Sequence, residues 1–226
     1  MGFFDKIIAA IKMFGTPEVL LLLALVALFV VYGRNIRRVG TRGMVLIGVF
    51  CALAGALGAA MRAIPGVQPT SFLVMMAGVL LGPGAGLAAG AVSALLFDFL
   101  SVVSIYTPWR MMLWGLMGLG AAYLPRKLWL LAVYGFVWGF VFGWVSNLVY
   151  FVDGFLPFTW TAVIASCAAS FWFEVSHALC NACLLLFLSL PVAAIARRSG
   201  IGRPFVKKKA NENDSANLHD EGGTNA

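Results

Sequence analysis

Residues 70–104 read TSFLVMMAGVLLGPGAGLAAGAVSALLFDFLSVVS, and this stretch decides the fold class. Asp98 is its only charged residue, so the stretch cannot cover itself with the polar surface that a soluble domain needs. Gly82-Pro83-Gly84 interrupts the apolar run, and such a tight turn lets two helices reverse direction with few exposed backbone groups. The stretch therefore predicts two membrane helices, near 70–82 and 85–104.

The rest of the chain has the same character. Of its 226 residues, 62% are hydrophobic and only 11% are charged, against about 45–50% and 25% in soluble domains. A spanning helix needs about 20 largely apolar residues. With short or tilted segments allowed, the apolar runs predict seven helices, near 17–33, 43–64, 70–82, 85–104, 109–124, 128–151 and 161–196. We expect an all-α, polytopic membrane helix bundle.

The distribution of the net charge of +7 orients this bundle. Three basic clusters lie at ends of apolar runs, a pattern typical of cytoplasmic loops and not of nucleic-acid binding. Their members are Arg34, Arg37, Arg38 and Arg42; Arg126 and Lys127; and Arg197, Arg198, Arg203 and Lys207 to Lys209. Only Lys6, Lys12, Arg62 and Arg110 fall on the other side. We predict an outside amino terminus and a cytoplasmic carboxyl terminus.

The two ends of the chain differ from the apolar middle. Apolar residues between Phe3 and Phe14 recur with the spacing of a short interfacial helix. Residues 210–226 are rich in Asn, Asp, Gly and Ser, which predicts disorder. The run 19–31 lacks a small-residue cleavage site and predicts a mature helix rather than a signal peptide.

Small residues recur at helical spacing in two of the predicted spans. One row consists of Ala52, Ala56 and Ala60, and the other of Gly135, Gly139 and Gly143. Such rows let helices approach closely in lipid. Internal packing is the favoured role of the glycine row.

Polar residues near the predicted outer side are candidates for a binding site. Arg62 lies where the positive-inside rule disfavours it, and residues 64–70, IPGVQPT, follow it as a turned loop with Gln68 and Thr70. Such a loop could line an outward-facing pocket. A connector whose Arg62 reaches lipid headgroups is an equal alternative.

A second group of candidates lies around the predicted fifth span. Asp98 is well inside the fourth span and Arg110 starts the fifth, after Trp109. Ionisable groups inside a membrane usually face a partner or a cavity. An ion pair and a ligand contact are equally good interpretations of these two charges.

The last two spans add further polar side chains. Glu174, His177 and Asn181 share one helical face, while Asn147 and Tyr150 end the sixth span before the aromatic residues 155–160. Glu and His three residues apart also occur in di-metal sites, but no other span carries the remaining ligands. The favoured hypothesis is that the three residues of the last span line a polar cavity or hydrogen-bond across helices. The aromatic residues could form the walls of a binding site, but an interfacial aromatic belt is the favoured interpretation of any single one.

No catalytic signature is present in the sequence. It contains neither Gly-x-x-x-x-Gly-Lys-Ser/Thr nor Gly-x-Ser-x-Gly, the motifs of P-loop ATPases and serine hydrolases. We expect a protein that is not an enzyme, has no metal or cofactor, and takes energy for any transport from a partner or an ion gradient.

Two segments resemble the substrate-binding S components of energy-coupling factor (ECF) transporters. They are residues 62–90, RAIPGVQPTSFLVMMAGVLLGPGAGLAAG, and residues 106–118, YTPWRMMLWGLMG. The proline-rich loop, the short helix, the Gly-Pro turn and the Thr-Pro-Trp helix start occur in the same order as in that family. The resemblance covers residues 43–196.

The resemblance implies a function and a domain organisation. S components capture a vitamin or related micronutrient outside the bacterial plasma membrane and deliver it with a membrane scaffold protein and two ATPase subunits. It implies a six-helix core at 43–198. An interfacial helix, an extra transmembrane helix that the family core lacks and a basic loop precede this core at 1–42, and a cytoplasmic tail follows it at 199–226. Ala52, Ala56 and Ala60 match the family's scaffold-docking pattern.

The substrate implied by the resemblance is a vitamin, with a corrinoid as one possibility and other vitamins or a queuosine precursor as others. Arg62 and Arg110 would suit an anionic group. Two alternatives to the S component are a structural membrane protein of similar fold, of the cell-shape type, and an intramembrane hydrolase that uses Glu174 and His177.

Overall fold

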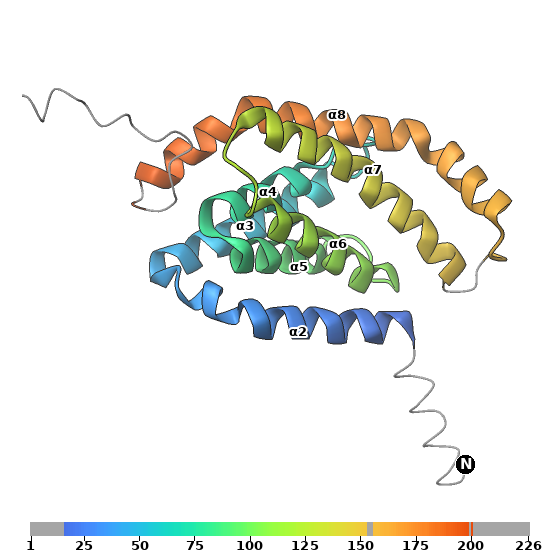
Figure 1. The fold of residues 1–226 in the computed structure, drawn as a ribbon, viewed down its shortest axis with the longest axis horizontal. Helices are drawn as coiled ribbons and strands as arrows, with labels where there is room; N and C mark the ends of the chain where they lie inside the picture. Colours follow the sequence, from blue (N-terminus) through green and yellow to red (C-terminus); the bar gives the residue numbers. More distant parts are fainter. Residues whose placement is uncertain (1–15, 153–155, 199, 201–226) are drawn as a thin grey trace, which may run out of the picture.

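The computed structural model describes residues 16–152, 156–198 and 200. Within this part of the chain the secondary structure is entirely helical, which confirms the predicted class and the predicted number of helices (Figure 1). The helices are α2 (Pro17–Arg37), α3 (Gly40–Ala60), α4 (Pro69–Leu81), α5 (Pro83–Phe99), α6 (Tyr106–Ala121), α7 (Leu128–Val152) and α8 (Trp160–Arg198). The predicted amino-terminal interfacial helix and the predicted disordered tail lie outside the described residues.

Four helices are long and apolar enough to cross a membrane by themselves: α2, α3, α7 and α8. The 13 residues of α4 extend about 20 Å, less than the roughly 30 Å of a hydrocarbon core. All side chains from Thr70 to Leu80 are buried, so α4 is an internal helix that the others surround. This burial explains why its sequence is apolar on every side.

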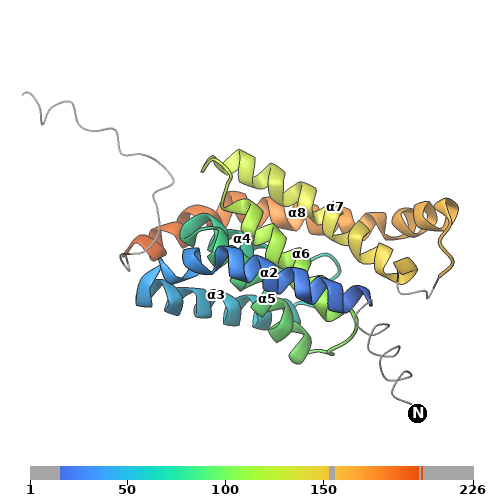
Figure 2. The same cartoon turned by 60° about the horizontal axis from the view of Figure 1, so that its bottom comes forward.

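The helices form a core of six with a seventh against its outside. α4 contacts α3, α5, α6 and α8, while α7 and α8 pack along each other. In Figures 1 and 2, α2 lies along α5 and α6, away from the α7–α8 pair. Leu25 is the one buried residue of α2. This arrangement agrees with the predicted six-helix core and extra amino-terminal span.

Close glycine contacts hold the core helices together. At Gly90 of α5, a Cβ atom would collide with the backbone carbonyl of Trp114 in α6. Gly86 and Gly118 meet in the same way one turn further along. The predicted row on α7 also packs internally, with Gly139 against Ala178 of α8. Small residues let these helices approach to backbone contact, which is the main source of association in lipid.

The basic stretch 34–42 is more helical than predicted. α2 continues to Arg37 and α3 starts at Gly40, so only two residues separate the helices. Gly40 has φ +67°, a left-handed conformation that turns the chain between them. Residues 61–68 and 100–105 form longer connections at the opposite end of the bundle, while residues 122–127 connect α6 to α7 at the same end as the α2–α3 break.

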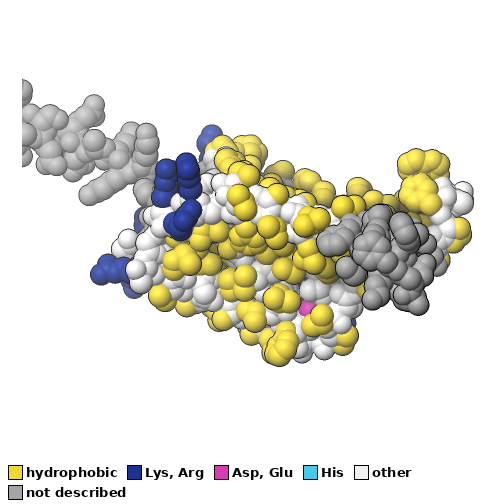
Figure 3. Space-filling view, turned by 90° about the horizontal axis from the view of Figure 1, so that it is seen from below, with side chains coloured by type: hydrophobic (Ala, Val, Ile, Leu, Met, Phe, Trp, Pro, Cys, Tyr) yellow, Lys and Arg dark blue, Asp and Glu magenta, His cyan; other side chains and the backbone are white. Residues whose placement is uncertain are grey.

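The two ends of the bundle therefore differ in charge. We call the end that carries the α2–α3 break, the α4–α5 turn and the carboxyl end of α8 the basic end, and the opposite one the pocket end. Arg126 donates to the carbonyl of Val79 at 3.0 Å, which attaches the second basic cluster to this same end. Lys and Arg side chains gather there on the surface shown in Figure 3.

Candidate functional site

An inner cavity of about 290 Å³ lies at the pocket end. It is enclosed by the 61–68 connection and by α5, α6, α7 and α8. The polar residues that line it are Arg62, Gln68, Arg110 and His177, and the apolar ones are Ile64, Phe97, Trp114, Phe142 and Phe173. Residues far apart in the chain thus converge on one volume.

The 61–68 connection brings Arg62 and Gln68 to this cavity. Gly66 turns the connection with φ +75°, and a Cβ there would lie 2.9 Å from the backbone nitrogen of His177. The connection is therefore packed against α8 and forms part of the cavity wall. Arg62 and Gln68 thus lie at a cavity, and a ligand contact by either residue stays a prediction.

Aromatic rings make up much of the wall. Trp114 lies at its centre, with its ring centroid 5.5 Å from that of Phe97 and 5.1 Å from that of Phe142. Phe142 in turn meets the His177 ring edge-on at 5.7 Å. Such edge-on and tilted contacts fix the rings against one another. The wall is suited to a flat, apolar ring system.

A buried hydrogen-bond chain connects three helices behind this wall. Trp114 Nε1 donates to Ser71 Oγ at 3.1 Å, and Ser71 Oγ lies 3.0 Å from His177 Nε2. The chain fixes the His177 ring and leaves its Nδ1 atom without a protein partner. Gln68 Oε1 is likewise buried and without one. Buried polar atoms normally have hydrogen-bond partners, so both are suited to contact a ligand.

The two arginines at the cavity differ in their charge balance. Arg110 forms an ion pair with Asp98 at 2.9 Å, and its Nε atom donates to the same carboxylate at 3.1 Å. Its guanidinium also lies 5.9 Å from the ring centroids of Phe97 and Tyr106. Arg62 has no ion-pair partner within the described residues. The uncompensated positive charge of the site is therefore that of Arg62.

An outer cavity of about 500 Å³ shares both arginines with the inner one. Its other lining residues include Ser104, Tyr106, Asn147 and Tyr150. The Asn147 side chain donates to Ser170 Oγ at 2.7 Å, which connects α7 to α8 beside the cavity. Arg62 and Arg110 border both volumes, so the two cavities are neighbours that share these side chains.

The structure places the sequence-predicted residues in three groups. Those lining a cavity are Arg62, Gln68, Arg110, Asn147, Tyr150 and His177. Asp98 lines neither cavity but holds Arg110. Thr70, Trp109 and Glu174 also line neither: Thr70 donates to the Ala54 carbonyl at 2.7 Å, and Glu174 packs against Gly143 of α7. The exposed aromatic residues Phe158, Trp160 and Trp172 are not part of the aromatic wall either.

The rings that form the wall were not among the predicted site residues, although the sequence carries a signal for two of them. Trp114 lies one helical turn after Arg110, and Phe173 one turn before His177. Residues four apart share a helical face, so both follow from residues already selected. Phe97 and Phe142 carry no such signal, because apolar aromatic residues are common throughout these spans.

The fold and the two cavities are those of a multi-pass helical membrane protein with an aromatic-walled polar site at one end. Residues 38–129 match the family model described as "ECF-type riboflavin transporter, S component". This match confirms the resemblance to ECF S components. That family consists of substrate-binding transporter subunits and is not a class of enzymes. No curated protein and no solved structure matches the chain significantly.

The matched segment covers less than half of the chain but includes much of the site. It spans α3 to α6 and so contains Arg62, Gln68 and Arg110, as well as the alanine row. His177 and the cavity-lining residues of α7 lie beyond it. Their assignment to the site depends on the geometry described above.

Proposed function

We propose that the chain is the substrate-capture subunit of an ECF-type importer, and that its inner cavity binds a flat, ring-containing micronutrient of the riboflavin type. The carrying observation is the convergence of four aromatic rings with Arg62, Gln68, Arg110 and His177 on one cavity. Sites for small molecules are mostly apolar with a few placed polar groups. The family description adds riboflavin as the first candidate.

The size of the cavity favours a ligand smaller than a corrinoid. A corrin ring with its side chains is far broader than a single fused aromatic system, while the inner cavity measures about 290 Å³. A flat ring could stack between the aromatic side chains, and a polar substituent would then extend past the arginines into the outer cavity. Arg62 would donate to an oxygen of that substituent through a charge-assisted hydrogen bond.

A binding experiment tests this proposal directly. Purified full-length protein in detergent is titrated with riboflavin, a deazapurine precursor of queuosine and cobalamin, with tryptophan fluorescence and calorimetry as readouts. We expect saturable binding of riboflavin or another flat heterocycle at or below micromolar concentration. Binding of cobalamin alone would assign the corrinoid instead, and a folded protein that binds no member of the panel would contradict the site.

Substitution of Arg62 locates the ligand. Arg62→Ala should weaken binding by about tenfold or more, because a hydrogen bond to a charged group contributes about 1.5–3 kcal/mol. The matched control is Arg34→Ala, which removes the same charge from an exposed position at the basic end. Equal affinity of the Arg62 variant and the control would place the ligand elsewhere.

We further propose that the pocket end faces the outside of a bacterial plasma membrane. The basic clusters at the opposite end support this orientation through the positive-inside rule. The same titration on right-side-out vesicles should then need no permeabilisation. Binding that appears only after permeabilisation would reverse the orientation.

The outer face of α3 supports a docking role toward the ECF scaffold protein and its ATPase module. Ala52, Ala56 and Ala60 are exposed, and Gly48 extends the same stripe by one turn. An exposed stripe of small residues allows close approach by a helix of another protein. We propose this stripe as the contact with the scaffold, as in the S components that the sequence resembles.

A bulky substitution separates docking from substrate binding. Ala56→Trp should lower the yield of complex with a co-expressed scaffold–ATPase module by at least about fivefold, because the side chain would hold the helices apart. Ligand affinity of the isolated subunit should stay unchanged. Ala165→Trp, on the exposed face of α8, is the control. A complex yield equal to that of the control would show that the stripe does not contact the scaffold protein.

A further inference from the structure

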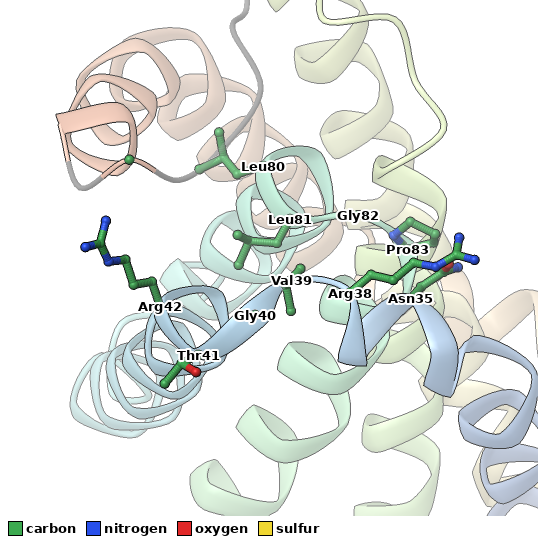
Figure 4. A pocket seen from close by; sticks show the side chains of 11 residues that line it. Asn35, Arg38, Val39, Gly40, Thr41, Arg42, Leu80, Leu81, Gly82 and Pro83 are labelled. Atoms are coloured by element: carbon green, nitrogen blue, oxygen red, sulfur yellow. The ribbon is translucent and has the colours of Figure 1, made fainter.

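A third cavity, of about 640 Å³, lies at the basic end, apart from the two cavities of the substrate site. Its walls are the break between α2 and α3, the turn between α4 and α5, and Gly200 after α8 (Figure 4). α2 and α3 are both long enough to span a membrane, and the cavity is formed where they meet. It therefore lies at the depth of the lipid headgroups on that side.

Two arginines flank this cavity. Figure 4 shows Arg38 and Arg42 on opposite sides of Val39, Leu80 and Leu81, with their guanidinium groups well separated. Both side chains are exposed, and neither forms an ion pair or a side-chain hydrogen bond with the described residues. Their charges are thus available to a ligand.

The remaining lining residues add no negative charge. Asn35 and Thr41 contribute polar groups, and none of the described residues that line the cavity is acidic. The first turns of α3 and α5, which start beside it, also contain no acidic residue. The result is a positively charged rim around a floor of aliphatic side chains.

We propose that this cavity binds the phosphate headgroup of an anionic phospholipid. A single guanidinium group can bind phosphate oxygens with paired, charge-assisted hydrogen bonds, so either Arg38 or Arg42 can hold the phosphate while the other adds attraction for the negative charge. The aliphatic floor of Val39, Leu80 and Leu81 would contact the glycerol and the first methylenes of the acyl chains, which a soluble phosphate lacks. Basic cavities between spanning helices are known as a form of lipid-headgroup site.

Native mass spectrometry of the full-length protein tests this assignment. The protein is titrated with phosphatidylglycerol and, separately, with phosphatidylcholine of the same acyl chains. We expect the first adduct of phosphatidylglycerol to form at least about tenfold more tightly, since each basic residue near an anionic headgroup contributes roughly 1 kcal/mol. No preference in the native protein would overturn the proposal.

Charge-matched double variants separate the cavity from general surface charge. Arg38→Ala/Arg42→Ala should reduce the preference to about twofold or less. Arg34→Ala/Arg37→Ala removes the same charge from the same cluster without touching the cavity and should keep most of it. Arg38→Lys/Arg42→Lys, which keeps both positive charges, should retain part of the preference for phosphatidylglycerol. An equal loss of the phosphatidylglycerol preference in the two alanine variants would show that it comes from diffuse surface charge, and would contradict a binding site in this cavity.

A competition arm identifies the source of the phosphate. Millimolar inorganic phosphate should leave the first phosphatidylglycerol adduct in place, because the aliphatic floor contributes nothing to binding of the free ion. Displacement of the lipid by inorganic phosphate alone would assign a soluble phosphate ligand and contradict the lipid. Binding of riboflavin-type ligands to the same variants should be unchanged, so this proposal and that of the substrate site fail independently.

Discussion

Replacement of Gly90 by leucine is expected to lower both the yield and the melting temperature of the folded protein. The Cβ atom of any other residue at this position would collide with the backbone of Trp114 and Gly115 in α6. Backbone atoms cannot move aside as a flexible side chain can, so α5 and α6 would have to separate. Overpacking of a core costs about 1–3 kcal/mol and sometimes more, and here it also disrupts the contact between Gly86 and Gly118. The measurement is the yield of monodisperse protein and its melting temperature in detergent.

Gly48→Leu is the matched control for this prediction. Gly48 also lies within a helix, but a Cβ atom there would meet nothing within 4 Å. Leucine has a higher helix propensity than glycine, so this variant should fold at least as well as the native protein. A Gly90 variant that melts at the same temperature as the control would show that the α5–α6 contact is not needed for folding.

The helical architecture could be predicted because lipid imposes simple demands on a sequence. Every backbone polar group must be satisfied within the membrane, so long apolar runs become helices. In the run 70–104, the Gly-Pro turn predicted a boundary between two helices. The structure confirms this boundary, since α4 ends at Leu81 and α5 starts at Pro83. The packing role of the glycine row on α7 followed from the same physics.

The exact helix ends were less predictable. Apolar residues such as Val102 and Val103 extended the predicted fourth span to 104, yet both are exposed in the connection that follows α5. In lipid an exposed valine is no anomaly, so hydropathy does not mark where a helix stops. The basic stretch 34–42 misled in the opposite direction, since charged residues continue the helix almost without interruption.

The polar part of the candidate site was accessible from the sequence, whereas its aromatic part was accessible only for Trp114 and Phe173. Arg62, Arg110 and His177 interrupt the apolar pattern of the chain. Such residues are energetically costly in a membrane, so their presence indicates a functional role. Phe97 and Phe142 obey the pattern, so only the packing of distant helices distinguishes them from lipid-facing rings. Glu174 shows that a charged residue in a span need not line the cavity, because its carboxylate packs against α7 and lines neither cavity.

The second large effect is expected at the ion pair between Asp98 and Arg110. Arg110→Ala should destabilise the protein by about 3–5 kcal/mol, because it leaves a carboxylate that is only 1% exposed without its charged partner. The sequence alone allowed this pair to be either a structural contact or a ligand contact. Loss of binding in the single variant could not distinguish the two, since a partly unfolded site also binds poorly.

The double variant removes that ambiguity. Asp98→Ala/Arg110→Ala deletes both charges, so the unpaired carboxylate disappears and the double variant should be more stable than Arg110→Ala by about 2 kcal/mol or more. Melting temperature and chemical unfolding measure this recovery. A double variant no more stable than the single one would show that Arg110 stabilises the fold through contacts other than the carboxylate.

Ligand binding by the recovered double variant then decides the second role of Arg110. Its Nε and Nη2 atoms hydrogen-bond to Asp98 and Ser104, while Nη1 has no hydrogen-bond partner in the described part of the chain. Arg110 also borders both cavities. We therefore expect the folded double variant to bind ligand about tenfold more weakly than the native protein. Native affinity would make Arg110 a purely structural residue. Because the pair is neutral as a whole, its removal leaves the charge of Arg62 unchanged, and a loss of affinity would report the lost hydrogen bond rather than a changed net charge.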